Sequence, residues 1–127
     1  MRLPARAAYV VVDLGFGDQG KGSVTDFLAR DRGAHTVVRF NGGAQAGHNV
    51  VTPDGRHHTF AQFGAASFVP GVDTFLSRYM VLQPQAMVVE AEHLARAGVP
   101  DAFARTRIAR GATVITPFHR AANRLRE

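Results

Sequence analysis

The chain has 127 residues, of which 46% are hydrophobic and 20% charged, so its composition suits one folded domain with a core. It contains no cysteine, which excludes a disulfide framework, a thiolate zinc site and a cysteine nucleophile. No apolar run approaches the roughly 20 residues of a membrane-spanning helix, and the first residues lack the apolar core of a signal peptide. We therefore expect a cytoplasmic protein without a membrane partner.

The net charge is +5, and its distribution is uneven. Six arginines fall between Arg105 and Arg126, a skew that suits an anionic partner. Aromatic residues are sparse there, so we do not expect nucleic-acid binding and interpret the arginines as a solvated surface or as one that meets a missing part. Fourteen of the fifteen Lys and Arg residues are Arg, and Lys21 is the exception.

The first third of the chain predicts a strand, a helix and a second strand. Residues 9–14 are apolar and largely β-branched, as in a buried parallel strand. Residues 23–30 have a helical apolar spacing and end before Gly33, a natural C-cap. Residues 35–40 form the second strand. We expect these elements to make a βαβ unit with parallel strands and a right-handed crossover.

The remaining residues predict a hairpin, two strands and two helices. The hairpin spans residues 49–62, and a Pro-Asp-Gly sequence marks its turn. A strand over 80–82 precedes a helix over 84–98, and a strand over 106–115, broken at Gly111, precedes a helix over 117–127 without a stop signal. The predicted fold class is α/β, a P-loop-like mixed, largely parallel sheet flanked by helices, with a β-hairpin insertion.

A glycine-rich loop follows the predicted first strand and opens the first helix. Free backbone amides and the positive end of a helix dipole make such a loop an anion site, with phosphate as the natural ligand. Its spacing, Gly15-x-Gly17-x-x-Gly20, fits a dinucleotide fingerprint. An NAD site would place an acid at the end of the second strand, whereas this strand ends in Arg39. A domain that binds NADP remains a weaker alternative.

The same loop also fits most of a P-loop. Lys21 follows Gly20, as a P-loop requires, but Gly22 stands where a Ser or Thr would hold Mg²⁺. The carboxylate of Asp18 could hold the metal instead. A tight turn without a ligand is the structural alternative.

A second glycine-rich loop spans residues 41–49. Because ligands bind at the carboxyl ends of parallel strands, we expect both loops to face one crevice. Asp18 and His48 then become candidates for acid–base, metal-binding or charge-stabilising roles. A helix cap for Asp18 and a structural hydrogen bond for His48 are the alternatives. Arg39 either binds phosphate or is a surface charge.

These two loops resemble those of the adenylosuccinate synthetase family. The family's first motif, Trp-Gly-Asp-Glu-Gly-Lys-Gly, matches Phe16-Gly17-Asp18-Gln19-Gly20-Lys21-Gly22. Its second motif, Val-Val-Arg-Tyr/Phe-x-Gly-Gly-x-Asn-Ala-Gly-His-Thr, matches residues 37–49, which read VVRFNGGAQAGHN. The resemblance covers the whole chain but only about the first third of a family member. Residues 1–127 would thus be the N-terminal nucleotide-binding portion of such a domain, incomplete relative to the family fold.

The resemblance implies a ligase that joins IMP and aspartate at the expense of GTP, in purine nucleotide biosynthesis. It implies that Asp18 is the catalytic base and a Mg²⁺ ligand, that Gly47 supplies the second ligand, and that His48 is the acid. The residues implied to contact GTP or IMP are Gly17, Asp18, Gln19, Gly20, Lys21, Gly22, Ser23, Gln45, Ala46, Gly47, His48 and Asn49.

Several residues depart from the family pattern. Gln19 replaces Glu, Gln45 replaces Asn, Asn49 replaces Thr, and Asp13 stands where family members usually carry Gly. These changes point to a divergent member and leave the nucleotide and amino-acid substrates open.

The family's segments for aspartate, guanine and part of IMP follow later in the chain and have no counterpart here. We therefore expect a fragment or a subunit that a homodimer or another polypeptide completes, inactive alone. A non-catalytic nucleotide-binding module is the main alternative.

Overall fold

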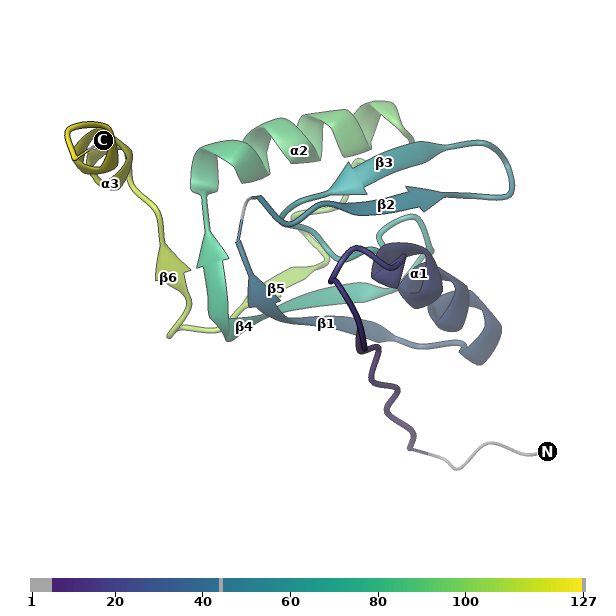
Figure 1. Ribbon diagram of the computed structural model, residues 1–127. Coiled ribbons are helices and arrows are strands. Elements are labelled where there is room, and N and C mark those ends of the chain that lie inside the picture. The colour runs from purple at the N-terminus through teal and green to yellow at the C-terminus, as the bar shows by residue number, and fades with distance from the viewer. Residues whose placement is uncertain (1–5, 44, 127) are drawn as a thin grey trace.

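The computed structural model describes residues 6–43 and 45–126, which Figure 1 shows as a ribbon. The helices are α1 (Lys21–Arg32), α2 (Pro84–Arg96) and α3 (Pro117–Arg124). The strands are β1 (Thr36–Gly42), β2 (His48–Val51), β3 (His57–Phe60), β4 (Asp73–Leu82), β5 (Thr106–Ile108) and β6 (Thr113–Val114). Helices flank a parallel sheet and a separate hairpin, so the predicted α/β class is confirmed.

The sheet is built around β4. This strand pairs in parallel with β1 on one side and with β5 on the other, and its last residues pair in parallel with β6. The strand predicted at residues 80–82 is therefore the end of a ten-residue strand. The strand predicted over 106–115 is divided into β5 and β6, with Gly111 in the interruption as expected.

The first predicted strand is wrong. Residues 9–14 form no strand, and side chains that the pattern predicts to be buried are exposed, Val10 by 84% and Leu14 by 96%. An apolar β-branched run becomes a strand only where a neighbouring strand and a covering layer accept it. The expected βαβ unit with this segment is also absent, and β4, α2 and β5 form the strand–helix–strand unit instead.

The predicted hairpin is present as β2 and β3. The two strands pair antiparallel, with His48 opposite Phe60 and Val51 opposite His57. In the turn, the amide of Gly55 donates to the carbonyl of Thr52 at 2.9 Å, and Gly55 adopts a φ of +85° that favours glycine. The Pro-Asp-Gly signal therefore predicted this element correctly.

The main core lies between β4, α2 and the hairpin. Its largest fully buried side chains include Phe60, Phe63, Leu76, Met80 and Leu94. In Figure 1 α2 runs along the hairpin and the upper part of β4, while α1 lies beside β1 and β2. A smaller cluster around Ala29 packs α1 against the segment before β4.

Helix α3 begins where the sequence predicts it. The Thr116 side chain accepts a hydrogen bond from the His119 amide, and the His119 ring accepts one from the Thr116 amide, which together form a capping box. The helix ends at Arg124 rather than at residue 127, and none of its residues is buried. Figure 1 shows it beyond β6 and apart from α2. Without a covering layer, its last residues gain little from remaining helical.

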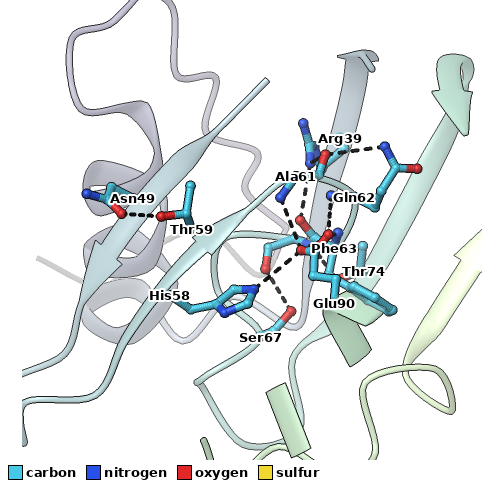
Figure 2. Close-up of polar contacts among 11 residues, drawn as sticks. Arg39, Asn49, His58, Thr59, Ala61, Gln62, Phe63, Ser67, Thr74 and Glu90 are labelled. Carbon is cyan, nitrogen blue, oxygen red and sulfur yellow. Dashed lines mark hydrogen bonds and ion pairs between the residues drawn. The ribbon is translucent and has the colours of Figure 1, made fainter. Parts of the chain in front are cut away.

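A buried carboxylate joins α2 to the segment that leaves the hairpin. Glu90 accepts hydrogen bonds from the backbone amides of Ala61, Gln62 and Phe63, at 3.1, 2.7 and 3.2 Å (Figure 2). The guanidinium of Arg39 donates to the carbonyls of Ala61, at 2.5 Å, and of Phe63, at 3.4 Å. One acid and one base thus bond the amides and two of the carbonyls of the same three residues.

We predict that Glu90→Ala lowers the free energy of unfolding by about 3 kcal/mol or more, because three buried amides lose a charged acceptor. Chemical denaturation followed by circular dichroism measures the loss. Glu92→Ala is the matched control on the same helix, because Glu92 is exposed and its pair with Arg96 is weak. Equal losses in the two variants would show that the buried carboxylate of Glu90 contributes no more to the free energy of unfolding than the exposed one of Glu92.

Candidate functional site

The first glycine-rich loop leads directly into α1. Gly17 and Gly20 have positive φ values of 96° and 78°, a backbone region that favours glycine. Gly20 is the N-cap residue, and no side chain caps the helix. The amides of the first turn therefore remain available to an anion, as the sequence predicts for a phosphate-binding loop.

The second loop connects β1 to β2 and returns the chain to α1. His48 is the first residue of β2 and lies against Gly22 in the first turn of α1. The hydroxyl of Ser23 donates to the carbonyl of Asn49 at 3.1 Å. The start of α1 and the start of β2 therefore lie in contact, whereas the prediction placed both loops at the carboxyl ends of two parallel strands, the first of which is absent.

Gly22 is the residue on which this junction depends. A Cβ at this position would lie 2.9 Å from the carbonyl oxygen of Asn49 and 2.9 Å from the Cβ of His48. A side chain such as the P-loop Ser or Thr has no room there. The departure from the P-loop pattern at Gly22 is thus explained by the close approach of β2.

Lys21 is bonded within its own loop. Its ammonium forms an ion pair with the carboxylate of Asp13 and donates to the carbonyl oxygen of Gly17 at 2.8 Å. The sequence interpretation identified Lys21 but missed Asp13 as its partner. The signal was present, since Asp13 interrupts an otherwise apolar run in the only segment that contains a lysine.

Burial lowers the pKa of His48 below its ordinary value, and the positive charges of Arg39 and Lys21 lower it further. The carboxylate of Asp18 acts in the opposite direction. His48 is half-buried, so its neutral form is favoured at neutral pH. A negative charge bound nearby would raise its pKa and favour the protonated form.

Arg39 is not the surface charge that one interpretation of the sequence predicted. Its side chain is buried and is only 7% exposed as a residue, with Nη1 bonded to the carbonyls described above and Nη2 buried without a hydrogen-bond partner. Burial lowers its pKa, and the charge of Glu90 opposes this effect. In this arrangement Arg39 supports the segment after the hairpin.

Glu90 is a second residue that the sequence interpretation missed. It lies three residues after Met87 and four before Leu94, on the buried face of α2. A carboxylate in an apolar helical stripe is a recognisable signal for a buried polar contact, because such a group is rarely buried without a partner.

The oxygen donors predicted for Mg²⁺ are few. Asp18 is exposed in the first loop, and the described residues contain no group of three or more His, Asp or Glu side chains that could hold a metal. Mg²⁺ commonly binds through one or two carboxylates, with water and substrate phosphates completing its shell. With Asp18 as its carboxylate, a Mg²⁺ site here would depend on phosphate and water oxygens for the rest of its shell.

A cavity of about 810 Å³ lies between residues 7–11, α1 and β1. Three of the predicted site residues line it, namely Lys21, Gly22 and His48. The others, from Gly17 to Gly20, Ser23, and in the second loop Gln45 to Gly47 and Asn49, lie outside its lining. Because only these three site residues line the cavity, it reaches the two loops at one end and does not enclose them. Much of the rest of its wall is apolar.

The side chain of Asn49 is engaged by its neighbours. Its Oδ1 is 2.7 Å from Nε2 of His57 and accepts a hydrogen bond from the Thr59 hydroxyl at 2.6 Å (Figure 2 shows the contact with Thr59).

None of the helices in residues 6–43 and 45–126 is both long and apolar enough to cross a bilayer.

Comparison with known proteins gives one consistent result. The family described as Adenylosuccinate synthetase matches residues 10–127. Over 118 residues, the chain is 36% identical to the adenylosuccinate synthetase of Neisseria gonorrhoeae, with 93% of this chain and 27% of that protein covered. Adenylosuccinate synthetase 2 of Chromobacterium violaceum is 37% identical over the same length, with 26% of it covered. The chain thus spans about a quarter of these relatives.

Two solved structures share the fold. The fully ligated adenylosuccinate synthetase from Plasmodium falciparum superposes with a TM-score of 0.71 at 23% identity, covering 87% of this chain and 24% of that one. A succinoaminodeoxyadenylate synthetase from cyanophage S-2L, bound to dGMP and dATP as an energy donor, superposes with a TM-score of 0.69 at 19% identity, covering 90% and 31%.

We predict that Gly22→Ala destabilises the protein by about 1 to 2 kcal/mol, although alanine has the higher helix propensity, because the new methyl group overlaps β2. Thermal or chemical unfolding measures the change. Ser23→Ala is the control, since it removes only an exposed hydrogen bond. A stabilised Gly22→Ala variant would show that α1 and β2 do not approach as closely as described.

We predict that Lys21→Met raises the pKa of His48 toward its ordinary value of about 6.5, because one of the charges that lower it is removed. An NMR titration of the imidazole protons measures this, with His48→Asn to assign the signal and Arg32→Met as an exposed control. Since the folded-state pKa is lowered, His48 contributes stability that is lost as pH falls through its unfolded value. An unchanged pKa in Lys21→Met would contradict the charge coupling.

Proposed function

This chain belongs to the adenylosuccinate synthetase family, and we propose that residues 1–127 are the N-terminal nucleotide-binding portion of such a GTP-dependent ligase. The proposed reaction joins IMP and aspartate into adenylosuccinate and converts GTP to GDP and phosphate. The contact of Gly22 with His48 is the observation that carries the proposal. It holds a candidate phosphate-binding loop against a loop that carries a candidate acid–base residue. Phosphoryl transfer depends mainly on such positioning and on electrostatic stabilisation.

In this proposal the first loop binds the GTP phosphates. The uncapped amides at the start of α1 and the backbone from Gly17 to Ser23 form the cradle. The ammonium of Lys21 neutralises phosphate charge. Its compact charge and flexible stem suit a tight cradle better than a planar guanidinium, which fits a chain that uses arginine elsewhere.

Magnesium is proposed to bind with the nucleotide. The carboxylate of Asp18 and the carbonyl oxygen of Gly47 would hold it. When bound, the ion offsets the negative charge that develops on the transferred phosphoryl group.

Asp18 and His48 are the proposed catalytic residues. Asp18 takes the proton from N1 of the purine, which makes the 6-oxygen the nucleophile toward the γ-phosphoryl group. His48 donates a hydrogen bond to the oxygen between the leaving and transferred phosphates. A neutral imidazole carries one N–H and can donate this bond, and the negative charge of the phosphates would raise the pKa of His48 and strengthen it.

The remaining site residues are proposed to border the IMP-like nucleotide. They are Gln19, Gly20, Gln45, Ala46 and Asn49. The side-chain oxygen of Asn49 is already bonded to His57 and Thr59, so its free groups toward a ligand are its amide hydrogens.

Turnover is proposed only for an assembly larger than these residues. The chain spans 27% of its Neisseria relative, so most of that protein's length has no match in these residues. A longer polypeptide, a homodimer or a second subunit in the cytoplasm would supply the rest. The second candidate is a nucleotide-binding module that does not turn over.

The nucleobase of the phosphate donor, guanine or adenine, is also part of the proposal. The superposable cyanophage enzyme is described with dATP as an energy donor. GTP is therefore proposed from the family, and ATP is the competing donor that an experiment should include.

A chimaera tests the function directly. Residues 10–127 replace the matching 118 residues of the Neisseria gonorrhoeae relative, and adenylosuccinate formation is measured with GTP or ATP. Activity with GTP supports the ligase. A folded chimaera that binds GTP without turnover supports the module, and one that binds no nucleotide overturns both.

In an active chimaera we predict that Asp18→Asn and His48→Asn each lower kcat by about 10² to 10⁴, the range for loss of an acid–base group. KM for GTP should change much less than kcat. Asp31→Asn, at the far end of α1, is the control. A change confined to KM would show that the substituted residue only positions substrate.

A further inference from the structure

The ion pair between Asp13 and Lys21 has no role in the proposed reaction. Asp13 lies before the loop, and Lys21 begins α1. The Asp13 side chain is only 12% exposed and that of Lys21 is 32% exposed, so water screens the pair less than it would on the surface. The only lysine of the chain is thus paired with a carboxylate from the segment that leads into the loop.

This pairing changes the charge that an approaching anion meets. Residues 13–21 contain two carboxylates, Asp13 and Asp18, and one ammonium, Lys21, a net charge of −1. A phosphate-binding loop normally offers a positive field to its ligand. Here the anion must either displace the Asp13 carboxylate or arrive with a cation that reduces its own charge.

We propose that Asp13 is a specificity-determining residue, the internal counter-ion of Lys21, which makes the loop select a triphosphate bound to a divalent cation over the free anion. A metal-bound triphosphate carries two fewer negative charges, and its cation is attracted to the carboxylates that repel the free anion. The proposal rests on the proposed function of Lys21 as a phosphate ligand.

A binding experiment measures the selectivity. Kd for GTP is determined with the purified protein in excess Mg²⁺ and in excess EDTA, for the wild type, Asp13→Asn and Asp31→Asn. The asparagine keeps the size of Asp13 and removes its charge. Asp31 is a matched control, because it forms an exposed ion pair with Arg32 at the other end of α1.

We predict that Asp13→Asn tightens binding of metal-free GTP about ten-fold or more and tightens binding of the magnesium complex much less. The ratio of the Kd in EDTA to the Kd in Mg²⁺ should therefore be smaller than in the wild type. Asp31→Asn should leave both values unchanged. An Asp13→Asn variant that binds metal-free GTP no more tightly than the wild type overturns the proposal. Weaker binding of both forms would also overturn it, because Asp13 would then only hold the loop in shape.

A second measurement separates this proposal from the proposed function. Because Lys21 is the only lysine, reductive methylation with ¹³C-formaldehyde gives one side-chain NMR signal besides that of the N-terminus. Pyrophosphate without metal should shift this signal at lower concentration in Asp13→Asn than in the wild type. A distinct outcome is that GTP binds to none of the variants while pyrophosphate still shifts the lysine signal at lower concentration in Asp13→Asn than in the wild type. That result would overturn the ligase proposal and support the proposed role of Asp13 as counter-ion of Lys21. Equal pyrophosphate responses overturn the counter-ion.

Discussion

The buried carboxylate of Glu90 is the contact on which the rest of the described fold depends. It accepts hydrogen bonds from three consecutive amides, those of residues 61–63, while Arg39 donates to the carbonyls of Ala61 and Phe63 in the same segment. These peptides leave the hairpin and would otherwise place unpaired polar groups in the core. The contact therefore joins β1, the hairpin and α2. Because β2 is part of that hairpin, it also fixes where His48 stands.

The candidate site is positioned by close packing rather than by polar contacts alone. The absence of a side chain at Gly22 lets α1 approach the backbone of His48 and Asn49. The same approach brings the start of a helix, with its free amides, beside a histidine. A glycine that breaks the P-loop pattern is thus the feature that brings the two loops together, and the metal-binding hydroxyl it replaces has no room in this arrangement.

Charge in the site is balanced within the chain. Asp13 neutralises Lys21, and burial together with two positive charges keeps His48 in its neutral form. Lys21 is thus paired before a ligand arrives, and His48 is an uncharged imidazole with one N–H to donate. A polyphosphate would compete with Asp13 for Lys21, and its negative charge would raise the pKa of His48.

The sequence alone determined the features that local chemistry controls. The Pro-Asp-Gly turn, the proline starts of α2 and α3, the Gly33 cap and the two glycine-rich loops are decided by backbone conformations that few residues allow. The family could be recognised for the same reason, since its motifs are short stretches of such residues. Tertiary structure decided what depends on neighbours distant in sequence. Residues 9–14 have the composition of a strand but no strand beside them, Arg39 is buried by a distant segment, and Asp13 meets Lys21 only because the loop folds back.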